Sequence, residues 1–274
     1  MRKFLLAGWL LLALIPLPAA ADPALPANLQ ARAAIVTGER DSWWEKTLVV
    51  SFPQPRRTLS TFDGFVEAWA VVNHSAHPLL WANVSEKFQA RDGRGGKAYT
   101  EFMREQTARG LRLDKRAISL VATAADMDNL AVVSRDFAPL AVTVLVTAGA
   151  RTNALRTGVD SSGFIEGEEP AGTINVILLT NARLTDGAMA RAIVTVTEAK
   201  TAALQDLQVP STYTPQVQAT GTGTDSVIVV SGSDGPLATY TGGHSKLGEL
   251  IGKATYDAVL EALEKQNGFR KVAR

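Results

Sequence analysis

Three turns in the second half of the chain combine glycine with small polar residues, and each turn borders an apolar segment. Glycine lets the backbone approach a ligand closely, and successive turn amides can form a concave set of hydrogen-bond donors. Threonine and asparagine add uncharged donors and acceptors. One turn of this kind is typical of any loop, but three favour a shared site for an uncharged polar ligand. The turns cover residues 147–153, 219–225 and 240–244.

Four ionisable residues on or near these turns could transfer protons. Asp225 ends the second turn, and His244 ends the third. Glu198 and Lys200 belong to a predicted helix, and a projection at about 100° per residue places Lys200 inside its apolar stripe and Glu198 on the opposite side. An inward lysine must extend its charged end to solvent or find a partner. A histidine beside a carboxylate can activate water, so these residues are candidates for hydrolysis.

The composition disfavours other catalytic arrangements. The chain has no cysteine, which excludes a thiolate nucleophile and cysteine-ligated metals. A zinc site with three histidines would use all three that the chain has, His74, His77 and His244. No Gly-x-Ser-x-Gly nucleophile elbow occurs. We therefore expect neither a metal nor a cofactor, and we interpret His74 and His77 as structural or rim residues of a turn before Pro78.

Segments rich in β-branched residues alternate with helical patterns along the chain, as in an α+β fold or an α/β fold with a mixed sheet. No repeat or break in composition divides the chain, so residues 34–274 form one predicted domain after a lead-in at residues 22–33. Thr185 or Asp186 is expected to cap one helix, and Ser245 to start another. The predicted strands cover residues 48–52, 65–72, 118–124, 130–134, 141–147, 173–180 and 226–231. The predicted helices cover residues 98–109, 186–207 and 246–266.

The first 21 residues have the three parts of a secretory signal peptide: a basic start at Arg2 and Lys3, an apolar run over residues 4–15, and small residues at 19–21. The run is shorter than the roughly 20 residues that a membrane span needs. Cleavage after Ala21 would give a periplasmic or secreted protein without stable membrane insertion. It would leave 26 basic and 27 acidic residues, which is no footprint for nucleic acid. The expected partner is a small molecule.

Taken in order, four segments resemble the adenosylcobinamide amidohydrolase family, CbiZ. Their order, spacing and lengths match that family, and they cover most of the chain after residue 141. A weaker match over residues 59–75 extends the resemblance, while residues 22–58 carry little of it. The four segments are VTAGARTNALRTG (146–158), GTINVILLTNARLTDGAMARAIVTVTEAKTAAL (172–204), ATGTGTD (219–225) and YTGGHSKLGELIG (240–252).

The resemblance implies hydrolysis of the amide that joins the corrin ring of (adenosyl)cobinamide to its aminopropanol arm. The products would be (adenosyl)cobyric acid and aminopropanol, as in corrinoid salvage. The cobalt belongs to the substrate itself. The corrin ring carries a fringe of primary amides, and neutral side chains and backbone groups can pair with them.

The resemblance names the residues above as candidates and does not give their roles. Our hypothesis assigns water activation to Glu198 or Asp225, and protonation of the leaving amine to His244 or Lys200. The backbone amides of residues 221–223 would stabilise the oxyanion. The expected substrate contacts are Gly149, Asn153, Arg156, Asn175, Asn181, Thr220, Gly221, Thr222, Gly223 and Gly243.

The export signal departs from the family pattern, because family members are regarded as cytoplasmic enzymes that act on the adenosylated corrinoid. Adenosylation requires intracellular ATP, so an exported member would meet cobinamide with a different upper ligand. Two other hypotheses remain. One is an exported corrinoid-binding protein that serves an uptake system without catalysis, and the other is an unrelated secreted α+β domain. The sequence does not indicate an oligomeric state.

Overall fold

The computed structural model describes residues 22–84, 95–161 and 172–271, so the predicted signal peptide lies outside the described residues. Within them, no helix is long and apolar enough to cross a membrane. The main helices are α2 (Gly95–Leu111), α3 (Asp186–Asp206) and α4 (Lys246–Asn267). The strands are β1 (Arg32–Arg40), β2 (Trp43–Ser60), β3 (Gly64–Ala76), β4 (Ile118–Thr123), β5 (Ala131–Phe137), β6 (Leu140–Ala148), β7 (Ile174–Thr180), β8 (Arg183–Leu184), β9 (Ser226–Val230) and β10 (Leu237–Ala238).

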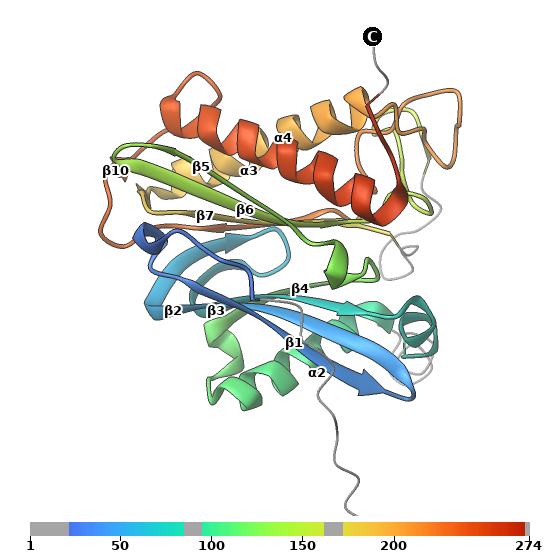
Figure 1. Cartoon of the computed structure of the whole chain (residues 1–274), viewed down its shortest axis with the longest axis horizontal. Helices are drawn as coiled ribbons and strands as arrows, with labels where there is room; N and C mark the ends of the chain where they lie inside the picture. The colour runs from blue at the N-terminus through green and yellow to red at the C-terminus, as the bar shows by residue number, and fades with distance from the viewer. Residues whose placement is uncertain (1–21, 85–94, 162–171, 272–274) are drawn as a thin grey trace, which may run out of the picture.

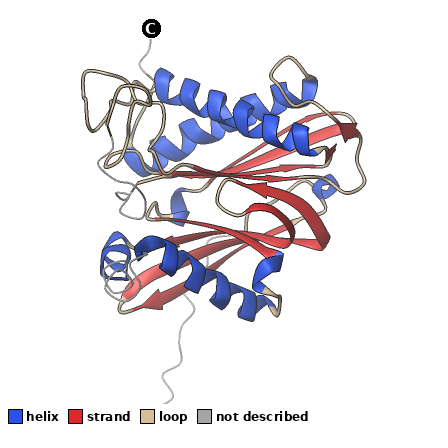
Figure 2. Cartoon of the chain, turned by 180° about the vertical axis from the view of Figure 1, so that it is seen from behind, coloured by secondary structure: helices blue, strands red, loops and turns tan. Residues whose placement is uncertain are grey.

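These elements form four layers in the order helix, sheet, sheet, helix (Figures 1 and 2). Helices α3 and α4 cover the layer that holds β5, β6, β7 and β9, and α2 covers the layer that holds β1 to β4. Parallel pairs (β3 with β4, β7 with β9) occur beside antiparallel pairs in one eight-stranded sheet. The predicted α+β class is therefore confirmed, and the sheet is mixed.

Strand β2 joins the two sheet layers. Its first part pairs with β1 and β3, and its last residues, 58–60, pair with β9. The pairing with β3 is irregular between Ser51 and Arg56, where Pro53 and Pro55 lie. Proline has no amide hydrogen to donate, so it interrupts a ladder. This interruption allows one continuous sheet to fold over itself.

Three apolar cores separate the four layers. Between the sheet layers, Leu48 and Val71 pack with Leu145, Ile177 and Ile228. A second core lies between β6, β7 and the helices α3 and α4, and a third lies under α2. Because β-strand side chains alternate between faces, neighbouring residues of β7 serve different cores. This double burial explains the nearly continuous apolar sequence of β6 and β7.

Most predicted elements are confirmed with small changes at their ends. Thr185 caps α3 by accepting a hydrogen bond from Ala188 N, and Ser245 caps α4 by accepting one from Gly248 N. The sequence analysis missed β1, which begins inside the predicted lead-in and pairs along its whole length with β2. The lead-in also packs on the fold, since Leu29 is buried between the sheet layers. Leu29 and Ala33 of this segment are therefore part of the core between the sheet layers.

His74 is structural, but it does not lie in a turn. It is fully buried in β3, where its Nδ1 bonds Thr47 Oγ1 at 2.9 Å and its Nε2 bonds Tyr99 OH at 3.0 Å. Tyr99 OH donates to Glu45 Oε1 at 2.8 Å, so the histidine must supply the proton of the Nε2 bond. The ring is therefore neutral with its hydrogen on Nε2. Burial lowers the pKa of His74 to about 4.

This lowered pKa predicts a stability change between pH 7 and pH 5. The unfolded chain binds a proton at His74 near pH 6.5, whereas the folded chain resists it until about pH 4, so stability falls as the pH drops through this window. We expect His74 to account for about 2 kcal/mol of loss from pH 7 to pH 5. Urea unfolding at both pH values should show a smaller loss for His74→Gln than for the wild type. Equal losses would contradict the assignment.

Candidate active site

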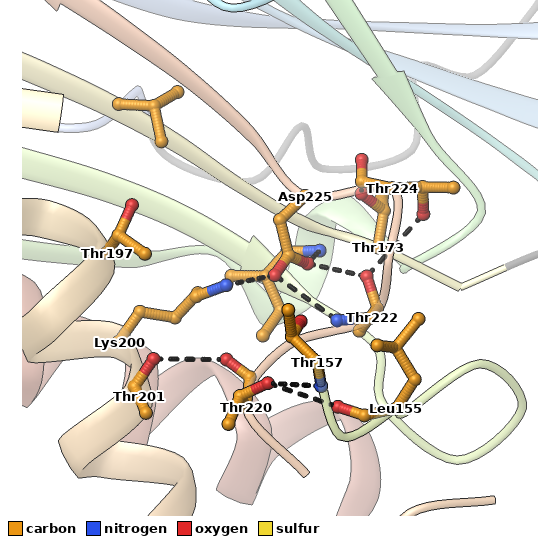
Figure 3. A network of polar contacts seen from close by, with 12 residues as sticks. Leu155, Thr157, Thr173, Thr197, Lys200, Thr201, Thr220, Thr222, Thr224 and Asp225 are labelled. Carbon is orange, nitrogen blue, oxygen red and sulfur yellow. Dashed lines mark hydrogen bonds and ion pairs between the residues drawn. The ribbon is translucent and has the colours of Figure 1, made fainter. Parts of the chain in front are cut away.

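The site lies where the N-terminal ends of β7 and β9 meet the last turns of α3. The two strands are parallel with Asn175 opposite Ser226, so the residues that precede them, Thr173 and Asp225, reach the same edge of the sheet. Helix α3 brings Lys200 to this edge, and its side chain points toward Asp225 (Figure 3). The parallel register thus gathers chain segments that are about 50 residues apart in sequence.

Lys200 and Asp225 form a buried ion pair at the centre of the site. Lys200 Nζ donates to Asp225 Oδ2, and the two side chains are 10% and 14% exposed. The inward position that the helical projection predicts for Lys200 is confirmed, because the residue is buried among the apolar stripe of α3. A lysine taken from water needs such a partner, since an isolated buried charge is strongly unfavourable.

Asp225 accepts three further hydrogen bonds. Thr222 Oγ1 and Ile174 N donate to Oδ1 at 2.5 and 3.0 Å, and Thr222 N donates to Oδ2 at 3.2 Å. A carboxylate has about four lone-pair directions, and with Lys200 all four are in use. In this arrangement Asp225 has no lone pair to offer to water. The geometry favours Asp225 as the group that holds Lys200 in place.

Gly221 lies directly against the ion pair. A Cβ at this position would stand 2.4 Å from Asp225 Oδ2 and 2.7 Å from Lys200 Nζ. Both distances are shorter than real contacts, so any side chain must displace one partner. Glycine is thus required here by close approach, and the Gly221 turn (residues 219–225) encloses the pair.

Gly221→Ala should consequently lower turnover by about 100-fold, because a misplacement of about 1 Å in a catalytic group costs that much. The measurement is the steady-state rate of the amide cleavage that the resemblance to the CbiZ family implies. Gly187→Ala is the matched control, since a Cβ at Gly187 in α3 meets nothing within 4 Å. A Gly221→Ala protein with the wild-type rate would show that the pair's position does not matter.

The Gly221 turn is fastened to the Asn153 loop (residues 149–161). Leu155 N donates to Gly221 O at 2.9 Å, and Thr220 N donates to Leu155 O at 2.8 Å. Gly223 has a φ of 75° and approaches the Leu155 side chain so closely that an added Cβ would lie 2.4 Å from its Cδ2. Thr201 of α3 donates to Thr220 O at 3.1 Å (Figure 3).

Asn153 connects this loop to the strand ends. Its Nδ2 donates to Gly172 O at 3.1 Å and lies 3.4 Å from Thr224 Oγ1, while its Oδ1 accepts from Tyr213 OH at 3.0 Å. Gly149, another predicted substrate contact, donates its N–H to Thr173 O at 2.9 Å. The first and second Gly-rich turns are therefore brought together, as the sequence analysis expected.

Arg156 and Asn175 lie beside the site in supporting positions. Arg156 is partly exposed, and its Nη1 donates to Gln218 O at 3.3 Å. Asn175 is buried between the sheet layers, where its Nδ2 donates to Asn73 Oδ1 and to Ala122 O, both at 3.0 Å. Because its side-chain amide is buried and already hydrogen-bonded, Asn175 supports the strand ends from the core between the sheet layers and is not available to a ligand.

Glu198 and His244 are not brought to the ion pair. Glu198 is exposed on the outer face of α3, opposite Lys200. The third turn, which carries Gly243 and His244, is held against the first half of α3: Thr241 Oγ1 donates to Ala188 O at 2.6 Å. Thr195 Oγ1 also donates to Thr241 O at 2.9 Å. At about 1.5 Å per residue, Ala188 and Thr195 lie about 18 and 8 Å along the helix axis from Lys200. Among the described residues, no hydrogen bond or ion pair joins the third turn to Lys200 or Asp225, so the inclusion of this turn in the site stays a prediction.

Asn181 also lies at the other end of the sheet. It follows the C-terminal end of β7, where its Nδ2 donates to Pro139 O and its Oδ1 accepts from Ala141 N, both at 2.8 Å. The backbone carbonyl of Asn181 lies so close to Gly232 and Gly235 that neither residue has room for a Cβ. These contacts make Asn181 a structural residue of the β5–β6 hairpin, away from the ion pair.

Sequence reasoning missed Thr173, Asp160 and Tyr213 as parts of this region. Thr173 Oγ1 donates to Thr224 O at 2.8 Å, and the other two belong to loops with no regular period. The signal that could have shown Tyr213 is an aromatic residue within a run of Ser, Thr and Pro that leads into the Gly221 turn. Among the described residues, no three His, Asp or Glu side chains gather as a metal site would need.

Residues 32–271 match the profile of the CbiZ family, adenosylcobinamide amidohydrolase. The chain belongs to this family of hydrolases, which act on an amide.

Two relatives support this membership. The uncharacterized protein MJ1613 of Methanocaldococcus jannaschii is 43% identical over 239 residues, which cover 82% of this chain and 88% of the relative. The adenosylcobinamide amidohydrolase of Methanosarcina mazei is 32% identical over 173 residues, 60% of this chain and 74% of the relative. Among solved structures, the PH0078 protein from Pyrococcus horikoshii OT3 aligns over 90% of this chain and 89% of its own, with a TM-score of 0.43 and 12% identity.

Proposed function

We propose that the protein hydrolyses the amide between the corrin ring of cobinamide and its aminopropanol arm, and that the Lys200–Asp225 pair is the catalytic centre. Water adds to the amide carbon, the C–N bond breaks, and the nitrogen takes a proton. The products are cobyric acid and aminopropanol. Family membership supports the substrate class, and the buried ion pair beside the Gly-rich turns is the observation that supports the location.

Lys200 is the proposed proton donor. Amide nitrogen is a poor leaving group until it is protonated, and a positioned acid supplies that proton in the transition state. Asp225 pairs with Lys200 and holds its side chain against the Gly221 turn. When Lys200 turns to the leaving nitrogen, one lone pair of Asp225 Oδ2 becomes free for water. The backbone amides of the exposed Gly223 and of Gly221 are the proposed oxyanion donors, because Thr222 N already serves Asp225.

The rival hypothesis is capture of cobinamide without cleavage. A neutral, amide-fringed ligand can be bound by asparagine, threonine and backbone groups alone, so capture requires no buried ionic pair. The pair carries a desolvation cost, which favours a role in chemistry.

Product analysis separates the two hypotheses. Purified protein is incubated with cobinamide, with and without an adenosyl upper ligand, and aminopropanol and the corrinoid mass are measured. Release of aminopropanol together with cobyric acid is the expected result. A shift in the corrinoid absorbance spectrum without product would establish capture without cleavage. The absence of both a spectral change and product would show that the protein does not bind corrinoids.

We also propose that the protein is exported and acts in corrinoid salvage outside the cytoplasm, on the basis of residues 1–21. Cell fractionation followed by determination of the N-terminus should find the mature chain outside the cytoplasm, beginning at Asp22. An intact Met1 on the cytoplasmic protein would contradict export.

A further inference from the structure

Tyr213 is an exposed aromatic side chain that is held in a fixed position beside the site. The residue is 46% exposed, yet its hydroxyl donates to Asn153 Oδ1 at 3.0 Å. Its backbone N donates to Ser211 Oγ at 3.0 Å. A ring that is anchored at both ends offers a large apolar surface and loses little conformational entropy when a ligand covers it.

The loop that carries Tyr213 (residues 208–218) is clamped to the Asn153 loop. Asp160 Oδ2 accepts from Ser211 Oγ at 2.6 Å and from Arg156 N at 2.5 Å. Thr212 N donates to Ala154 O at 2.8 Å. These bonds hold the two loops as one rigid unit.

This unit carries the exposed apolar side chains of Tyr213 and Val159, here called the apolar edge, and it is bonded to the Gly221 turn that holds the ion pair. Val159 is 55% exposed on the Asn153 loop, and Leu155 packs against Gly223 of the Gly221 turn. Asn153, which holds Tyr213, lies 3.4 Å from Thr224 Oγ1. From Thr224, hydrogen bonds lead through Thr222 to Asp225 (Figure 3). The apolar edge and the catalytic centre therefore share one scaffold.

We propose that Tyr213 and Val159 form the surface that receives the corrin ring and thereby positions the amide at Lys200. The inference rests on the proposed function, which supplies a substrate with a large, mostly apolar macrocycle far wider than the amide that is cut. Such a substrate needs a contact outside the reacting centre, and binding energy from that contact places the amide. Tyr213 is a positioning residue and takes no part in proton transfer.

The test compares substrate binding with turnover in four variants: Tyr213→Ala, Tyr213→Phe, Val159→Asp and the control Phe137→Ala. Phe137 is 56% exposed on the β5–β6 hairpin, at the opposite end of the sheet. The readouts are KM and kcat for cobinamide and the Kd for cobyric acid, which retains the corrin ring and cannot be cut. The Kd comes from absorbance titration.

We expect Tyr213→Ala to raise both KM and Kd by about 10- to 100-fold, the loss expected for one buried apolar side chain, with kcat within about threefold of the wild type. Val159→Asp should act in the same direction, since it places a charge on the surface without touching the clamp. Tyr213→Phe keeps the ring and should raise both constants less. Wild-type constants in Tyr213→Ala and in Val159→Asp would overturn the inference.

The same readouts distinguish this inference from the proposed function. If the wild type releases no aminopropanol but Tyr213→Ala still weakens cobyric acid binding, the corrin-binding surface is supported and the proposed hydrolysis is contradicted. If the wild type cleaves cobinamide and the variants bind cobyric acid with the wild-type Kd, the proposed hydrolysis is supported and the corrin-binding surface is contradicted.

Discussion

Lys200→Met is expected to lower the turnover of cobinamide by about 10²- to 10⁴-fold, the contribution typical of a positioned acid. Methionine has nearly the length of lysine and fills the same space among the apolar residues of α3, so packing is preserved. Asp225 keeps its three other donors in this variant. We therefore expect the protein to stay folded, and the rate of aminopropanol release measures the effect.

Lys253→Met is the matched control for this substitution. Lys253 lies on α4 with its side chain 64% exposed, and it pairs with Glu249 across one helical turn. Exposed pairs of this kind contribute little, so the control should retain the wild-type rate. Near-normal turnover by Lys200→Met would remove Lys200 from the catalytic centre.

Asp225→Ala is expected to have the second large effect, on stability as well as on turnover. The substitution leaves a buried ammonium and three other donors without their acceptor at once. Removal of one partner of a buried ion pair costs about 3–5 kcal/mol. The free energy of unfolding in urea measures this loss, and aminopropanol release should fall with it because Lys200 is no longer held.

Asp257→Ala provides the comparison for Asp225. Asp257 pairs with Arg135 on the surface, where the two side chains are 38% and 45% exposed, so we expect a change of at most about 1 kcal/mol. If Asp225→Ala lowered the free energy of unfolding no more than Asp257→Ala, the Lys200–Asp225 pair would contribute no more to stability than an exposed ion pair does.

The parts of the site that could be predicted from sequence are those that local periodicity determines. The position of Lys200 follows from the 3.6-residue repeat of α3, and Asp225 follows from its place directly before a strand. Both signals depend only on neighbours in the chain. Family resemblance covers the same segments and names the chemistry.

The rest depends on contacts that are distant in sequence. His244 looked suitable because its turn resembles the other two, but that turn packs against the first half of α3, where Thr241 bonds Ala188 and Thr195. Asn181 likewise has a suitable amide, which backbone groups across a hairpin occupy. Tyr213 lies in a loop without any period, and only the clamp through Asp160 gives it a fixed place.

The folded double variant Lys200→Met/Asp225→Leu tests the central claim most directly. Replacing both partners of a buried pair by apolar residues is often neutral or stabilising, so this variant should recover stability that Asp225→Ala loses. Its rate of aminopropanol release from cobinamide is the decisive measurement. The account predicts a stable protein that releases aminopropanol at less than about a hundredth of the wild-type rate, and a stable double variant with near-normal release would contradict it.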